Sequence, residues 1–170
     1  MKGLIKRLLR EGLLEDISLS IGKPVKDIEL SDADKASIKN LSWKDIDFEQ
    51  LNEDSPVILK VILPIQLDLS NAISLEIQLT RNGLYQPHLF IADSLRGLGL
   101  GYKLHIALIH AFGHLYSANA RRLNDIEIPK IWSKLKNEPN ISCVSNDMGE
   151  LCVSSHLKNN DELINQFKTI

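Results

Sequence analysis

The sequence predicts an α/β domain with a mixed, mostly antiparallel sheet flanked by helices. Three observations carry this prediction. Apolar and polar residues alternate in short segments after residue 56, as they do in half-buried strands. A glycine-rich turn at residues 96–102 follows one of these segments. Residues 100–115 then form a long apolar segment, which is typical of a buried helix.

The expected elements follow from turn and capping residues. Ser31 or Asp32 is expected to cap a short helix that ends near Asn40, whereas residues 43–51 show no clear period. No strand is identified before residue 56. Strands are predicted at residues 57–67, 75–79, 84–92, 141–145 and 150–154, with tight turns at Asn82-Gly83 and residues 146–149. Helices are predicted at residues 100–115, 130–136 and 161–168, the second with Pro129 in its first turn.

Composition limits the classes of protein. With 170 residues, 44% of them hydrophobic, the chain fits one domain at residues 27–170 with an N-terminal extension at residues 1–26. The net charge of −2 makes a nucleic-acid partner unlikely by charge alone. No apolar run is long enough to span a bilayer, so a soluble, cytoplasmic protein is expected.

The first 26 residues differ in charge from those that follow. They contain six Lys or Arg against three acids, whereas residues 27–54 contain nine acids against three lysines. On a helical wheel one side is apolar (Leu4, Ile5, Leu8, Leu9, Gly12, Leu13) and the other mostly basic (Lys2, Lys6, Arg7, Arg10). An amphipathic helix is predicted, which packs on its own domain or docks on a partner protein or an anionic surface.

The glycine turn is the main candidate for a ligand site. Gly97, Gly99 and Gly101 let the backbone approach a ligand, and a helix N-terminus behind them offers unpaired N–H groups and partial positive charge. A dinucleotide fingerprint requires glycine at position 104, which is Leu104, and no Gly-Lys-Ser/Thr of a Walker motif follows. An anionic cofactor and an ordinary strand-to-helix turn remain the two interpretations.

The order of strands, glycine turn, long helix, shorter helix and terminal hairpin resembles the second half of the GNAT acyltransferase superfamily, over roughly residues 56–155. Arg96, Gly99 and Gly101 match that family's cofactor motif, with apolar residues on both sides. The resemblance implies that residues 96–102 hold the pyrophosphate of acetyl-CoA or another acyl-CoA, whereas the backbone of Leu89 and Ile91 binds the pantetheine arm. The residues implied in the turn are Arg96, Gly97, Leu98, Gly99, Gly101 and Tyr102.

The activity implied by the resemblance is direct acyl transfer from the thioester to an amine of a protein or small molecule. Many family members use a tyrosine as the acid, but the matched position here is Trp132, whose indole has no usable proton and is expected to pack. Tyr102 and Tyr116 are the remaining nearby phenols, and Tyr116 is the candidate acid. His88, on the strand before the turn, is the candidate base, with a sheet-surface histidine as the alternative.

A second function class stays open on sequence grounds. Trp132 favours a protein that keeps this fold for binding or structure without catalysis, such as a phage component that would be virion-associated. Strands 84–92 and 141–145 distinguish the two classes: strands that splay apart would form the cofactor cleft typical of the family, whereas closed strands would favour the non-catalytic protein.

Histidines and cysteines are the remaining reactive side chains. His110 and His114 lie four residues apart on the predicted long helix, but without a third ligand they predict no metal site, and His105 is expected at the core edge or surface. Cys143 and Cys152 are expected to face each other across the final hairpin. Reduced, packed thiols are predicted because a disulfide between adjacent strands is strained and a cytosol would reduce it.

Overall fold

The computed structural model describes residues 25–118 and 127–170. The predicted basic helix at residues 1–26 therefore lies almost entirely outside the described residues. The helices are α3 (Asp32–Asn40), α4 (Leu100–Phe112), α5 (Glu127–Leu135) and α6 (Asn160–Thr169), with short 3-10 helices η1 (Trp43–Asp45) and η2 (Asp93–Leu95). The strands are β1 (Asp47–Gln50), β2 (Val57–Ile62), β3 (Ile73–Leu79), β4 (Tyr85–Ile91), β5 (His114–Ala118), β6 (Ile141–Asn146) and β7 (Gly149–Ser154).

These strands form two antiparallel sheets. The first has the order β1-β2-β3-β4 and the second the order β5-β7-β6. The break falls between β4 and β5, and β6 lies at the far edge of the second sheet, so residues 84–92 and 141–145 are not neighbouring strands and do not form the two sides of this break. The α/β class, with antiparallel strands flanked by helices, is confirmed, whereas the expected single mixed sheet is replaced by two sheets whose described pairings are all antiparallel.

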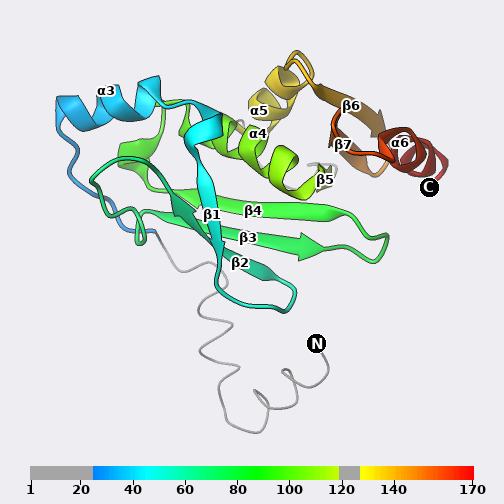
Figure 1. Ribbon diagram of the computed structural model, residues 1–170, viewed down its shortest axis with the longest axis horizontal. Helices are drawn as coiled ribbons and strands as arrows, with labels where there is room; N and C mark the ends of the chain where they lie inside the picture. Colours follow the sequence, from blue (N-terminus) through cyan, green and yellow to red (C-terminus); the bar gives the residue numbers. More distant parts are fainter. Residues whose placement is uncertain (1–24, 119–126) are drawn as a thin grey trace, which may run out of the picture.

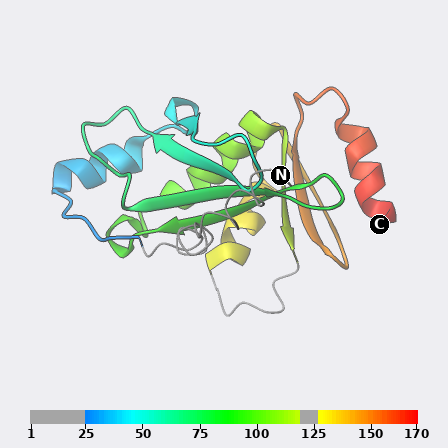
Figure 2. The same ribbon diagram turned by 90° about the horizontal axis from the view of Figure 1, so that it is seen from below.

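Helices cover the two sheets differently. Figure 1 shows α3, α4 and α5 on one side of the first sheet, and Figure 2 shows α6 at the outer side of the second sheet. Buried residues of α4, including Ile106 and Leu108, pack with Leu75 and Ile77 of β3 and with Trp132 of α5. On the opposite side of the second sheet, Phe167 of α6 packs against the buried side chains of β5 and β7.

We call the uncovered side of the first sheet the open face. It carries the even-numbered residues of β2, β3 and β4, because their odd-numbered neighbours pack into the core. Asp47 and Glu49 of β1 share this side through their pairing with Ile62 and Lys60. Among residues 25–118 and 127–170, no helix covers this face in Figure 1.

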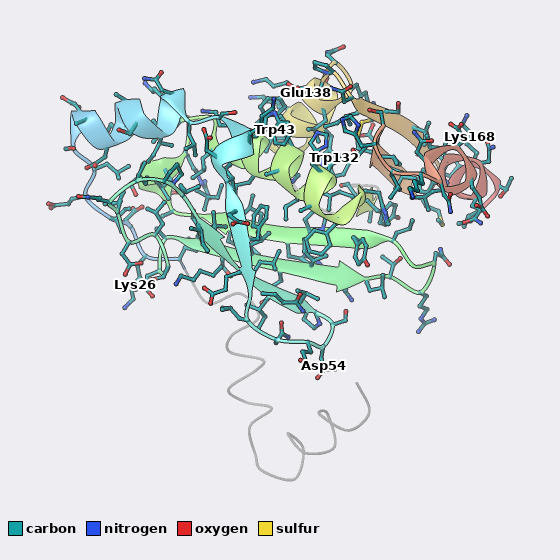
Figure 3. All side chains as sticks on the ribbon, viewed as in Figure 1. Lys26, Trp43, Asp54, Trp132, Glu138 and Lys168 are labelled. Atoms are coloured by element: carbon teal, nitrogen blue, oxygen red, sulfur yellow. A yellow bond between two sulfur atoms is a disulfide. The ribbon has the colours of Figure 1, made fainter. Side chains whose placement is uncertain are left out.

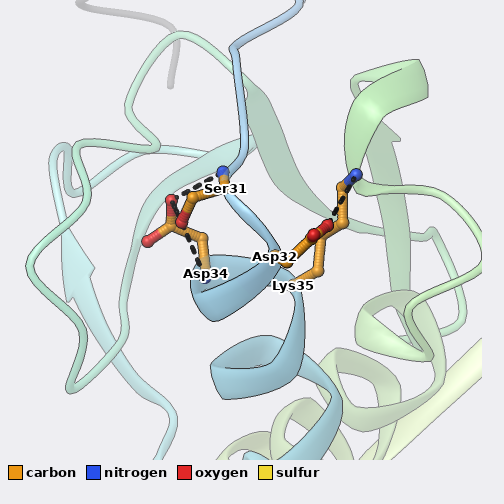
Figure 4. Close-up of polar contacts among 4 residues, drawn as sticks. All are labelled: Ser31, Asp32, Asp34 and Lys35. Carbon is orange, nitrogen blue, oxygen red and sulfur yellow. Dashed lines mark hydrogen bonds and ion pairs between the residues drawn. The ribbon is translucent and has the colours of Figure 1, made fainter.

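The start of α3 confirms the capping prediction. The Ser31 hydroxyl accepts a hydrogen bond from the Asp34 N–H, and the Asp34 carboxylate accepts one from the Ser31 N–H at 3.0 Å (Figure 4). Lys35 lies 3.9 Å from Asp32 on the exposed side. This reciprocal capping box satisfies two of the N–H groups that a helix leaves unpaired at its start.

Several predicted boundaries are wrong for local reasons. The second strand ends at Ile62 rather than residue 67, before Pro64 removes a backbone donor. The unassigned residues 43–51 contain η1 and β1, a strand whose polar sequence shows no alternation. The long helix ends at Phe112, because Gly113 adopts a φ of 83°, and the following residues form β5.

The prediction of reduced thiols is also wrong. Cys143 lies directly opposite Cys152 in the β6–β7 pairing, as expected, and the two sulfurs form a disulfide. The register brings their Cα atoms to 4.1 Å, so that the two side chains meet across the paired strands. Both residues pack in the cluster that contains Trp132 and Leu135.

Candidate functional site

The glycine turn joins η2 to α4 through two left-handed residues. Gly97 has a φ of 73° and Gly99, the N-cap of α4, a φ of 78°. A Cβ atom built at either position would meet no heavy atom within 4 Å. The backbone of this turn is therefore open to a ligand, at the positive end of a 13-residue helix.

Gly101 has a different role in the same turn. A Cβ atom there would lie 3.5 Å from Ile91 of β4 and 3.5 Å from Ile131 of α5. The missing side chain lets strand, turn and α5 approach one another. A methyl group fits at this position, whereas a large side chain would displace Ile91 or Ile131.

The edge of β4 leads into this turn. Opposite residues in an antiparallel ladder alternate between exchanging and not exchanging hydrogen bonds. The Ala92 N–H donates to the Ala72 carbonyl on the β3 side, and Pro87, which has no N–H, falls in the other set of residues. Leu89 and Ile91 belong to the Pro87 set, so their backbone groups point away from β3, toward the break in the sheet.

At the start of β5, the side chain of His114 contacts this edge of β4. The Tyr85 N–H donates to His114 Nε2 at 3.3 Å, and the two rings lie 5.0 Å apart. No backbone ladder joins β4 to β5 within the part of the chain that the structure describes. Leu89 and Ile91 lie on the same edge of β4, further along the strand than the contact between Tyr85 and His114.

Charges at the turn are mostly engaged by neighbours. Arg96 Nε lies 3.2 Å from Asp93 Oδ1, but both side chains are exposed, so this ion pair is weakly held. The Ser94 N–H donates a hydrogen bond to the Asp27 carboxylate. This hydrogen bond holds the pKa of the Asp27 carboxyl below its usual range. Lys103 donates to the carbonyls of Ile38 and Lys39 at the C-terminus of α3. Arg96 is therefore the turn's best-placed cation for an anionic ligand.

Tyr102 fixes the first turn of α4 to the segment after α5. Its hydroxyl donates a hydrogen bond to the Glu138 carboxylate, and Lys134 lies 5.9 Å from the centre of its ring. Burial, followed by the bond to Glu138, raises the pKa of the Tyr102 phenol. Glu138, labelled in Figure 3, was not predicted from the sequence as part of the site.

Trp132 packs as predicted. Its side chain is 3% exposed and lies in the core between α5 and α4 (Figure 3). His105 meets it edge-on at 6.1 Å and donates from Nδ1 to the Gly101 carbonyl at 2.7 Å. Burial lowers the pKa of His105, so this imidazole is a neutral core residue that supports the glycine turn.

The two candidate catalytic residues lie in different sheets. Tyr116 of β5 is buried, packs against Phe167 of α6 and donates from its hydroxyl to the Met148 carbonyl at 3.0 Å. Burial raises the pKa of its phenol. His88 of β4 lies on the open face, where Nε2 donates to Gln78 at 3.2 Å. The structure gives the two side chains separate partners and does not bring them together.

Glu76 is a further titratable group beside His88. It pairs with His88 across β3 and β4 and is buried, which raises the pKa of its carboxyl, while the imidazole opposes that shift. Sequence reasoning missed it because Glu76 appeared as the polar half of an alternating strand. Its burial depends on neighbours contributed by the other strands.

His110 and His114 both have partners within the fold. His110 stacks on Trp43 at 4.4 Å, and its Nδ1 lies 3.1 Å from the Ser154 hydroxyl. His114 belongs to β5 rather than to α4, so the expected spacing on one helix is wrong. In residues 25–118 and 127–170 no group of three or more potential metal ligands is found.

A cavity of about 220 Å³ lies elsewhere, lined by residues 60–63 and 67–70 at the end of β2 and the loop before β3. None of its lining residues belongs to the glycine turn.

Within the described helices, none is both long and apolar enough to cross a membrane.

Comparison with protein families and with curated proteins gives no match for this chain. The site is therefore defined by its geometry alone. It consists of the edge of β4 that is not paired with β5, followed by the open glycine turn at the N-terminus of α4.

Proposed function

We propose that this protein is an acyl-CoA-dependent N-acyltransferase that uses acetyl-CoA as donor and an amine of a protein or small molecule as acceptor. The amine nitrogen attacks the thioester carbonyl, the thiolate leaves and takes up a proton, and no covalent enzyme intermediate forms. The observation that carries the proposal is the free edge of β4 at Leu89 and Ile91 followed by the open turn at Gly97 and Gly99.

Two features of this arrangement suit an extended, anionic thioester. Backbone groups of Leu89 and Ile91 offer hydrogen bonds to an amide-containing arm, in the way that a strand edge binds a peptide. The turn offers N–H groups and helix dipole to a diphosphate, with Arg96 exposed beside it. The match of Arg96, Gly99 and Gly101 to the cofactor motif of the GNAT superfamily also supports the proposal.

Calorimetric titration with acetyl-CoA tests the donor site. Gly99→Asp and Gly99→Asn form a matched pair, because both side chains have similar size and both tolerate the left-handed backbone. We expect the aspartate variant to bind at least about tenfold more weakly than the asparagine variant, since only the former places a negative charge beside the diphosphate. Equal affinities, or no binding by the folded wild type, would contradict the site.

Catalysis is tested separately by release of the CoA thiol in the presence of an amine panel. The assignments of His88 as base and Tyr116 as acid predict that His88→Gln and Tyr116→Phe lower kcat while the affinity for acetyl-CoA is kept. Loss of affinity in both variants would indicate a structural role instead.

A protein that binds without catalysis is the second candidate. Trp132 is buried at the position where the family often has its acid, and the Tyr116 hydroxyl is engaged by Met148. Acetyl-CoA binding with no thiol release for any amine would favour this candidate, including a structural role in a phage particle.

A further inference from the structure

The open face of the first sheet carries apolar side chains in an exposed position. Ile62 is 42% exposed and Phe90 51% exposed, whereas the apolar residues on the opposite side of the same strands pack against the core and are buried or half-buried. Both residues lie at one end of the sheet, where β2 and β4 finish and β3 begins. Exposed apolar residues on the uncovered side of a sheet favour a docked element.

The chain enters the described structure at the same end of the sheet. The Lys26 N–H donates to the Asn71 carbonyl, just before β3, at 2.8 Å. The Ser94 N–H, just after β4, donates to Asp27 Oδ1 at 2.9 Å, and the Ile28 N–H donates to the Ser94 hydroxyl at 3.3 Å. These hydrogen bonds hold residues 26–28 close to Ile62 and Phe90. The chain segment 1–24 is therefore attached next to the exposed apolar end of the open face.

The charges of the two partners are complementary. Two exposed acids lie on the open face, Asp47 and Glu49, against one exposed lysine, Lys60, which pairs with Glu49 at 3.6 Å. The polar side of the predicted N-terminal helix carries Lys2, Lys6, Arg7 and Arg10, and its other side is apolar. Opposite charges around an apolar contact favour one orientation of docking.

The lengths of the two partners also agree. A helix of the 13 residues 2–14 is about 20 Å long at 1.5 Å per residue. The seven-residue strands β3 and β4 span about 23 Å at 3.3 Å per residue. A helix of this length can lie along the face without extending past it.

We propose that residues 1–24 dock on the open face of their own chain as an amphipathic helix. Leu4, Leu8 and their apolar neighbours contact Ile62 and Phe90, and basic residues at the edge of the apolar side lie beside Asp47 and Glu49 of β1. This interaction surface does not depend on the proposed acyltransferase activity. Its occupant is the chain's own N-terminal segment, in preference to a second copy or another protein.

Photo-crosslinking of the full chain tests this proposal. Phe90 is replaced by p-benzoylphenylalanine, an aromatic of related shape, at a position exposed enough to accept it. The control places the same residue at Leu79, which is 48% exposed but lies at the other end of β3 and on the other side of the sheet. After irradiation without any ligand, mass spectrometry identifies the joined peptides.

We expect crosslinks from position 90 to residues 1–24 within one chain, at a yield several-fold above position 79. Leu8→Asp should reduce this yield to the control level, whereas Ser18→Asp, which adds the same charge outside the apolar stripe, should not. Equal yields at positions 79 and 90 would overturn the proposal. Products between two chains, rising with protein concentration, would overturn it as well by showing a second copy on the face.

Discussion

The two sheets of this protein are built from similar antiparallel hairpins but are covered very differently. Within the described residues, the first sheet has helices on one face only, whereas the second lies between α4 and α5 on one side and α6 on the other (Figures 1 and 2). The second sheet is also crosslinked by Cys143 and Cys152. The second sheet is thus buried on both faces, whereas the first keeps one face and the edge of β4 accessible.

The boundary between the sheets explains how one fold supports both properties. The Tyr85 N–H donates a hydrogen bond to His114 Nε2 where β4 and β5 begin, and within residues 25–118 and 127–170 no backbone ladder continues between the two strands. In a continuous sheet, the backbone N–H and C=O groups of Leu89 and Ile91 would form hydrogen bonds with the neighbouring strand. The break leaves them at an edge, beside the glycine turn.

The largest expected difference between the sheets concerns burial. Leu151→Ala in the fully buried centre of β7 should lower the free energy of unfolding by about 2 to 5 kcal/mol, because it leaves a cavity. The same change at Leu79, half-exposed at the end of β3, should cost less than about 0.5 kcal/mol. Urea unfolding of both variants checks this difference, and similar losses would contradict the comparison.

Reduction of the disulfide should have the next largest effect. Cys143 and Cys152 are nine residues apart, and opening so short a loop should lower the free energy of unfolding by about 2 to 3 kcal/mol. Denaturant curves with and without dithiothreitol measure the loss. The Cys143→Ala, Cys152→Ala double variant is the control, because its stability should not respond to the reductant.

Tyr102→Phe tests the connection between the glycine turn and the segment that leads into the second sheet. Removal of the hydroxyl should cost about 1.5 kcal/mol, the lower end of the range for a hydrogen bond to a charged group. Glu138→Gln keeps an acceptor for that hydroxyl and should cost less. Thermal unfolding distinguishes the two variants, and a larger loss for Glu138→Gln would show that the carboxylate has another essential partner.

The smallest expected effect is a loss of stability at low pH, caused by His114 at the contact between β4 and β5. Burial lowers the pKa of His114, so the unfolded chain binds a proton more readily, and stability should fall as the pH drops below about 6.5. One such group contributes at most about 1.4 kcal/mol per pH unit. His114→Gln, which retains an acceptor for Tyr85, should reduce the slope of stability against pH. An unchanged slope would assign the pH dependence to other groups, such as His105.

The glycine turn and most helices were predictable because their signals are local. Three glycines before an apolar segment, Ser31 followed by Asp34, and Asp147 within a hairpin turn each determine the backbone over a few residues. β1 and the end of α4 were not predicted correctly. β1 gains its structure from pairing with β2, and the apolar sequence after Phe112 continues without a change of period although the chain changes from helix to strand.

The site was predicted only in its contiguous part. Gly97 and Gly99 are open as the turn required, but sequence alone did not place Tyr116 beneath α6 or Glu76 beside His88. Those neighbours come from segments far apart in the chain, and their contacts depend on strand register and helix placement.

The sequence by itself determined the α/β class, the turn at residues 96–102 and the facing positions of Cys143 and Cys152, since these follow from periodicity, glycine conformation and hairpin length. Only the tertiary structure decided that the strands divide into two sheets, that one of them keeps an uncovered face, and that the two sulfurs are bonded. Such features depend on which distant surfaces bury each other, because burial of apolar area has no short-range signature in the chain.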